Sequence, residues 1–198
     1  VKKVLIVFRK EWYEIIRNKL IVYTILVPPI LLAVLPLVML YVMRSEPMDA
    51  SDVQMYAQFA AALPWLSLEE VAMYVLLNQF ILMFLMMPVI IPVTIAAFSI
   101  IGEKEQKSLE PLLATPIRVN ELLAGKTLAA VVPALLTTWI AFAIFIAGAY
   151  FVASPALLRA LLTPMWLLAF FIMAPLFCIL SVAIGVVISS KVNDTRVA

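Results

Sequence analysis

The chain has 198 residues, of which 66% are hydrophobic and 13% are charged, and its formal net charge is +2. Soluble domains carry about a quarter charged residues, so this composition excludes an ordinary soluble domain, and the small net charge without a basic patch argues against a nucleic-acid partner. The absence of histidine removes histidine-based catalysis and the most common metal ligand, while the lone cysteine, Cys178, has no intrachain disulfide partner and is expected to be a small buried residue.

Residues 2–19 are predicted to form a helix that lies on the membrane surface. At 100° per residue, one side of this helix is apolar and the opposite side is basic and polar. The apolar side holds Val4, Leu5, Phe8, Trp12, Ile15 and Ile16, and the opposite side holds Lys2, Lys3, Lys10, Glu14, Arg17 and Asn18. This pattern is typical of an interfacial helix. An anchor that only orients the first span has the same pattern, so both interpretations stay open.

Four apolar runs without a charged residue follow, and each is long enough to cross a bilayer, which takes about 20 residues of helix. They cover residues 20–43, 71–101, 127–152 and 164–190. A membrane β-barrel would instead show short segments in which apolar and polar residues alternate. The sequence therefore predicts an all-α polytopic membrane helical bundle, with an interfacial helix and about four transmembrane helices in one domain over residues 1–198.

The segments between the spans also carry helix signals. Residues 53–66 are apolar but too short to span, and a short helix against the outer leaflet is expected there. Ser67 and Glu70 have the spacing of a capping box that starts the second span. Thr163 and Pro164 are predicted as the N-cap and first turn of the fourth helix.

Lysine and arginine favour the cytoplasmic side of a membrane, and here they alternate along the chain. Segment 1–19 has six of them and segment 102–126 has four, whereas segments 44–70 and 153–163 have one each. This alternation predicts a cytoplasmic N-terminus, a cytoplasmic 102–126 loop and a cytoplasmic position for residue 198.

The predicted spans carry few polar groups. No Asp, Glu, Lys or Arg lies in them, so they hold no charge relay of the kind that ion-coupled carriers often build. Asn78 and Gln79 are candidates for lining a substrate route, although hydrogen bonding between helices is the more frequent role of such residues. Residues 125–127, Gly-Lys-Thr, match the end of the phosphate-binding loop motif, but the motif also needs a glycine at position 120, which is Asn here. ATP binding by this chain is not expected, and Lys126 is interpreted as an anchor at the inner end of the third span.

The 102–126 loop is the most informative segment because it places eight charged residues between two uncharged runs. Ser108 can start a short helix whose apolar face would hold three leucines. Thr115 and Pro116 are predicted to end that helix and to cap the next one. A short amphipathic helix between two spans fits a groove on a soluble partner.

Residues 102–116, GEKEQKSLEPLLATP, resemble the cytoplasmic loop of type-2 ABC exporter permeases, especially the sodium-efflux and multidrug-like branch. That loop has a glutamate-rich start, a Thr-Leu-Glu step, paired leucines and a Thr-Pro, and a Gly-Lys then opens the third span. Lys107 and Ser108 stand where the family usually has Gly and Thr. Residues 9–19 are similar to the family's N-terminal elbow helix, and residues 189–196 to its cytoplasmic segment after the fourth span.

The resemblance implies the membrane permease subunit of an ATP-binding-cassette exporter, with a separate cytoplasmic ATPase subunit docked on the 102–120 loop. ATP and Mg would bind to that partner, and this chain would hold no catalytic, cofactor or metal site of its own. A second permease chain, in a homodimer or a heterodimer, and a location in the plasma membrane are also implied. Because the family generally has six spans, two more are expected beyond residue 198. The docking residues implied are Glu103, Glu105, Ser108, Leu109, Glu110, Leu112, Leu113, Thr115 and Pro116.

Two other classes of function compete with a permease. A membrane scaffold or assembly factor would use the same loop to recruit a cytoplasmic protein without transport. An intramembrane enzyme is disfavoured because the spans hold neither histidine nor carboxylates. The sequence leaves the transported substrate open.

Overall fold

The computed structural model describes residues 2–45, 50–105 and 117–191, apart from the side chains of 50–53, 97, 100–105, 119 and 188–191. Every element in these residues is helical. Four of the described helical segments are long and apolar enough to cross a membrane: Lys19–Ser45, Leu68–Ala96, Asn120–Val152 and Pro164–Val187. The predicted all-α bundle with four spans is therefore confirmed.

The first two helices are separated at a single residue. Helix α1 covers Lys2–Arg17 and helix α2 covers Lys19–Ser45. Between them, the Asn18 carboxamide oxygen accepts hydrogen bonds from the backbone N–H groups of Leu20 (3.1 Å) and Ile21 (3.4 Å). An asparagine at an N-cap satisfies backbone donors that the first turn leaves free. This cap lets the chain turn sharply from the elbow helix into the first span.

The next helices begin at the predicted capping box. Helix α3 (Ala50–Ala60) is the short helix expected before the second span, and helix α4 runs over Leu68–Glu105. The Ser67 hydroxyl accepts from the Glu70 N–H (3.2 Å), and a Glu70 carboxylate oxygen accepts from the Ser67 N–H (2.8 Å). The capping box is therefore confirmed. With 38 residues, α4 is about 57 Å long, well beyond a hydrocarbon core of roughly 30 Å.

Helix α6 covers Val119–Val152, and its N-cap is Arg118. The Arg118 N–H donates to the Glu121 carboxylate (3.0 Å). The helix therefore begins after Arg118, and the prediction that Thr115 and Pro116 cap it is wrong. The Glu121 carboxylate, three residues after the N-cap, accepts from the Arg118 N–H instead. Residues 102–105 belong to the end of α4, although the sequence predicts them in the loop, whereas residues 119–126 form the helical lead into the third span that the sequence predicts.

The fourth span is built from three pieces. Helix α7 (Pro155–Leu161) precedes it, and α8 (Pro164–Leu168), the π-helix η1 (Ala169–Met173) and α9 (Ala174–Lys191) follow one another. Thr163 is the N-cap of α8, as predicted, but its hydroxyl makes no capping bond. The π-helical turn, which the sequence analysis did not predict, leaves the Phe170 carbonyl to accept a hydrogen bond from the Trp139 indole (2.9 Å).

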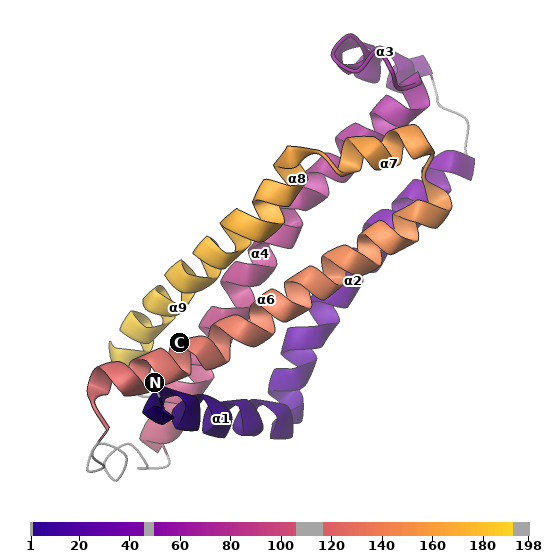
Figure 1. Cartoon of the computed structure of the whole chain (residues 1–198). Coiled ribbons are helices and arrows are strands. Elements are labelled where there is room, and N and C mark those ends of the chain that lie inside the picture. Colours follow the sequence, from indigo (N-terminus) through magenta and orange to yellow (C-terminus); the bar gives the residue numbers. More distant parts are fainter. Residues whose placement is uncertain (1, 46–49, 106–116, 192–198) are drawn as a thin grey trace.

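The spans form an elongated bundle with α1 lying across one end (Figure 1). Helix α4 packs most extensively against α9, α2 packs against α6, and α4 also packs against α6. Helices α3 and α7 lie at the opposite end from α1, and α9 ends on the same side as α1 (Figure 1).

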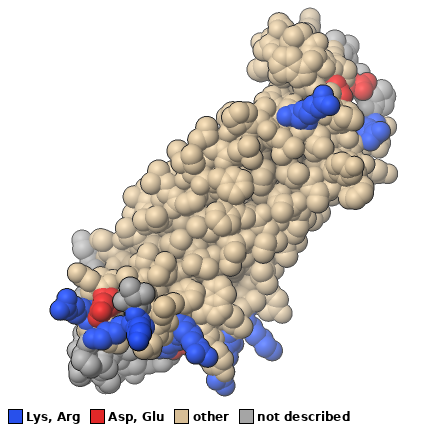
Figure 2. All heavy atoms as spheres, viewed as in Figure 1, with Lys and Arg blue, Asp and Glu red and all other residues tan. Residues whose placement is uncertain are grey.

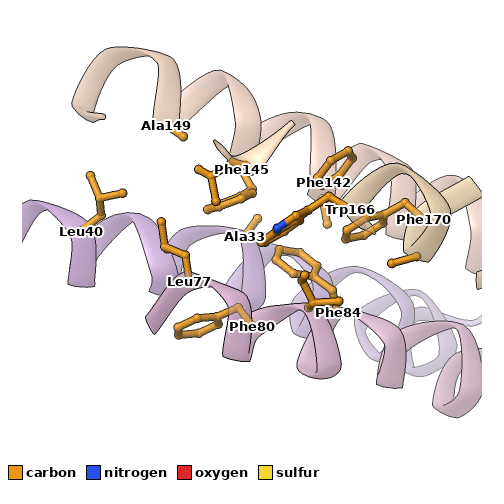
Figure 3. Packing of buried hydrophobic residues seen from close by; sticks show 14 of the residues in the cluster. Ala33, Leu40, Leu77, Phe80, Phe84, Phe142, Phe145, Ala149, Trp166 and Phe170 are labelled. Atoms are coloured by element: carbon orange, nitrogen blue, oxygen red, sulfur yellow. The ribbon is translucent and has the colours of Figure 1, made fainter. Parts of the chain in front are cut away.

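An aromatic cluster fills the bundle in the half nearer α7 (Figure 3). The Phe142 and Phe170 rings stack with their centroids 3.9 Å apart, and the Phe84 ring meets the edge of Phe170 at 5.4 Å. Trp166 is fully buried and lies nearly parallel to Phe145. A second cluster nearer α1 contains Cys178, which is fully buried, as expected from the sequence.

The charged side chains visible in Figure 2 gather at the two ends of the molecule and leave a broad apolar waist. Most of the visible lysines and arginines lie at the end that carries α1. Such a distribution fits a chain whose middle lies in hydrocarbon and whose ends lie in water.

Candidate functional site

A cluster of three polar side chains, two of them buried and one partly buried, joins α1, α4 and α6. The Lys126 ammonium, in the second turn of α6, lies 3.0 Å from Oε1 of Glu11 and donates to the Ser99 hydroxyl at 2.7 Å. Ser99 in turn donates to Oε2 of Glu11 at 2.6 Å. Glu11 belongs to α1 and Ser99 to α4, so each of the three helices contributes one side chain. We call Glu11, Ser99 and Lys126 the clasp.

The clasp excludes water to a degree that is unusual for charged residues. Glu11 is 3% exposed and Lys126 is 6% exposed. Charges this deeply buried are tolerated when they are paired and their remaining hydrogen bonds are made. Both Glu11 oxygens accept bonds within the clasp, and Lys10 adds a contact to Oε1 at 3.2 Å. The arrangement is therefore a satisfied polar network rather than an isolated ion pair.

The electrostatics of the clasp favour the ionised form of Glu11. Burial by itself raises the pKa of this carboxyl. The Lys126 ammonium, the Ser99 hydroxyl and the Lys10 ammonium together outweigh burial, so the pKa of Glu11 lies below its ordinary value. Glu11 is thus a carboxylate at neutral pH, as the ion pair requires.

A glycine brings α1 close enough for the clasp to close. A Cβ atom at Gly125 would lie 2.6 Å from Cβ of Val7 and 3.1 Å from the Val4 carbonyl oxygen. Only glycine leaves room for two helices to approach so closely. Val7, Glu11 and Ile15 are buried, and their i, i+4 spacing places them on one face of α1. This face packs on α6 next to Lys126.

The clasp lies at the ends of the two helices that frame the 106–117 segment. Ser99 is six residues before the end of α4 at Glu105, and Lys126 is seven residues after the start of α6 at Val119. The clasp therefore ties the end of α4 and the start of α6 to α1.

Hydrogen bonds also join helices at the opposite end of the bundle. Arg44, at the end of α2, donates to the Val152 carbonyl at the end of α6 (2.6 Å). Ser154 donates to the Glu70 carboxylate, and its hydroxyl also accepts from the Leu157 N–H (3.1 Å), which caps α7. These contacts are exposed or only partly buried, so water reaches them more easily than it reaches the clasp.

The two residues considered for a substrate route lie in different environments. The Asn78 carboxamide oxygen accepts from the Trp166 indole (3.2 Å), and its nitrogen donates to the Tyr74 carbonyl (3.1 Å). Asn78 thus forms a bond between α4 and α8, which is the alternative that the sequence analysis kept open for it. Gln79 is exposed on α4.

Among the described residues, two apolar grooves open on the surface of the bundle. One, of about 680 Å³, is lined by α6, α7 and η1, with Trp139, Phe142, Tyr150 and Phe171 among its walls. The other, of about 270 Å³, lies between α1, α2 and α6. Within the described residues, no three His, Cys, Asp or Glu side chains gather as metal ligands would.

Most of the expected docking residues fall outside the described part of the chain. Glu103 and Glu105 belong to the last turns of α4, but their side chains are not described. The remaining residues of that set lie outside the described residues: Ser108, Leu109, Glu110, Leu112, Leu113, Thr115 and Pro116. Their role in docking stays a prediction.

Glu11 and Lys126 take positions that the sequence does not predict. Glu11 belongs to neither predicted face of α1, and Lys126 is the predicted anchor at the inner end of the third span, whereas the structure buries both. A signal was present in the sequence, because Glu11 sits four residues from Val7 and four from Ile15, in the middle of an apolar stripe. A carboxylate at such a position needs a buried cation, and the candidate at a span end was Lys126.

The chain matches a known protein family. A protein-family model described as ABC-2 family transporter protein matches residues 5–198, a range that includes the whole clasp. No curated protein and no solved structure matches the chain significantly.

Proposed function

We propose, from the premise that this chain belongs to the ABC-2 transporter family and is a membrane permease component of an ABC transporter, that it is an exporter subunit driven by a separate ATPase. The ATPase subunit docks on the 102–120 segment from the cytoplasm, and its ATP hydrolysis moves the spans. The family match over residues 5–198 is the observation that carries this proposal.

The clasp suggests how movement of the docking segment would reach the spans. Helices α4 and α6 leave that segment on either side, and the clasp ties both of them to α1 through contacts of 2.6–3.0 Å. Packed helices with satisfied buried networks move as units rather than deforming continuously. We therefore infer that α1, α4 and α6 shift together when the ATPase closes.

The loop sequence and the charge distribution also indicate the branch of the family and the orientation in the membrane. The glutamate-rich loop and its paired leucines favour the sodium-efflux and multidrug-like branch, and export from the cell across the plasma membrane. The end that carries α1 faces the cytoplasm, because lysine and arginine are concentrated in segments 1–19 and 102–126. A second permease chain completes the transporter.

Co-purification with the cognate ATPase tests docking. Leu109→Asp and Leu112→Asp each place a charge on the predicted apolar face, and each should insert in the membrane but lose the ATPase, because the charge would enter an apolar groove unpaired. Gln54→Asp, at an exposed position on α3 at the opposite end of the bundle, adds the same charge outside the docking segment and should retain the partner.

Retention of the ATPase by both leucine variants would contradict docking on this face. The same preparation separates a permease from a scaffold. A permease should change the rate of ATP hydrolysis and support ATP-dependent efflux in vesicles, whereas a scaffold would bind the partner without either effect.

A further inference from the structure

The groove between α1, α2 and α6 has three apolar walls. Trp12 and Ile16 contribute from α1, Ile25 and Leu26 from α2, and Leu136 from α6. The one hydroxyl in the wall, Thr137, donates to backbone carbonyls of its own helix at 2.9 and 3.1 Å, so it offers no free donor to the groove. The walls are suited to a hydrocarbon chain.

The groove is open to the surroundings of the bundle. Ile16 is 59% exposed, Leu26 is 44% exposed and Leu136 is 43% exposed. Pro133, on the α6 wall, lies seven residues beyond Lys126, which is about 10 Å further along the helix. The groove therefore extends from the level of α1 to the depth where acyl chains lie.

Two basic residues stand where α1 turns into α2. Arg17 ends α1 and Lys19 starts α2, so they lie in the chain between the wall residues Ile16 and Val22. Both are exposed, and among the described residues neither takes part in an ion pair. An apolar groove beside two such cations is complementary to a molecule with an anionic head and a hydrocarbon tail.

We propose that this groove binds an anionic phospholipid of the leaflet that faces α1, with an acyl chain between Trp12, Leu26 and Leu136 and the phosphate near Arg17 and Lys19. Basic residues at the ends of membrane helices attract anionic headgroups, and an interfacial tryptophan favours the boundary between headgroup and tail. Because Ile15 lies on the same face of α1 as Glu11 and also lines the groove, the lipid would brace the elbow helix beside the clasp.

Native mass spectrometry of the purified full-length protein in detergent tests this site. Phosphatidylglycerol and phosphatidylcholine with identical acyl chains are titrated separately, and the retained lipid is counted. The wild type should retain phosphatidylglycerol preferentially. Arg17→Gln with Lys19→Gln should weaken that retention roughly 25-fold, since each basic residue near an anionic surface contributes about fivefold, and should leave phosphatidylcholine retention unchanged.

Two further variants make the test specific. Thr137→Phe places a ring in the groove and loses only hydrogen bonds within its own helix, so it should lower retention of both lipids. Lys2→Gln with Arg118→Gln removes the same charge from exposed positions on α1 and at the start of α6, and it should retain phosphatidylglycerol like the wild type.

Equal retention of the two lipids by the wild type would overturn the proposal, as would an unchanged preference in the Arg17 and Lys19 variant. An equal loss in the Lys2 and Arg118 variant would show general surface charge instead of a site. If Thr137→Phe lowered the dimer fraction and left the lipid in place, a second copy of the chain would be the occupant. None of these outcomes depends on the ATPase.

Discussion

Lys126 and Glu11 carry opposite charges, and both side chains are buried. Each provides the counter-charge that makes burial of the other possible. Removing one partner from such a pair leaves an uncompensated buried charge, whereas removing both often costs little. Lys10 contacts the same carboxylate oxygen but its side chain is 39% exposed. The two lysines therefore provide a comparison between a buried and a partly exposed interaction with one acceptor.

Lys126→Met should lower the free energy of unfolding by about 3–5 kcal/mol, because Glu11 stays buried without its main cation. Lys10→Met is the control and should cost less than about 1 kcal/mol. Thermal unfolding in detergent, followed by tryptophan fluorescence, compares the two. Similar losses from both substitutions would show that burial of Lys126 adds nothing to the interaction.

The lowered pKa of Glu11 gives the clasp a pH dependence with a definite sign. Because the pKa is lower in the folded than in the unfolded state, the unfolded state binds more protons in the interval between the two values, and stability is lost as pH falls. The difference in melting temperature between the wild type and Glu11→Gln should stay constant from about pH 6 to 8 and shrink below the ordinary glutamate value of 4.5. A difference that shrinks as pH rises above 6 would contradict this assignment.

At the scale of elements, the close crossing of α1 and α6 depends on Gly125. The atoms that a Cβ would meet there are Cβ of Val7 and the Val4 carbonyl, which belong to or adjoin the backbone of α1. At Gly148, by contrast, a Cβ would meet the δ-carbons of Leu37, the far end of a flexible side chain. The two glycines therefore differ in how easily their neighbours move.

Gly125→Ala should destabilise the protein and separate α1 from α6, although alanine in a helix is intrinsically favoured over glycine by about 1 kcal/mol. Gly148→Ala should be neutral or stabilising, since Leu37 can change rotamer. Unfolding curves measure both, and the reactivity of a Val7→Cys thiol reports whether α1 lifts. A stabilising Gly125→Ala would show that the helices tolerate a wider crossing.

Much of the element structure follows from local sequence signals. The spans are predictable because each needs about 20 uncharged apolar residues and each has them, and the start of α4 is predictable from Ser67 and Glu70. The π-helical turn at Ala169–Met173 is different, because it depends on Trp139 of another helix donating to Phe170. For the clasp, the apolar stripe around Glu11 indicates that a buried cation is needed, but local signals do not identify Lys126, which is 115 residues away.

Docking of an ATPase between α4 and α6 requires that α1 and the 106–117 segment face the cytoplasm. Single cysteines in a Cys178→Ala background report this in intact cells. Gln54→Cys and Arg159→Cys, at exposed positions in α3 and α7, should react with an impermeant maleimide, and Lys2→Cys and Asn120→Cys should react only after lysis. Labelling of Lys2→Cys in intact cells would reverse the orientation and remove the cytoplasmic docking surface.

If the clasp couples the docking segment to the spans, a double-mutant cycle on ATP hydrolysis should detect the coupling between Glu11 and Lys126. The rate of the cognate ATPase is measured alone, with wild-type permease, with Glu11→Met, with Lys126→Met and with both substitutions. Each single variant should bring the rate toward that of the ATPase alone, and the double variant should recover most of the permease effect, because no unpaired charge then remains to open the contact. Single variants that match the wild type, or a double variant no better than the worse single one, would contradict this coupling.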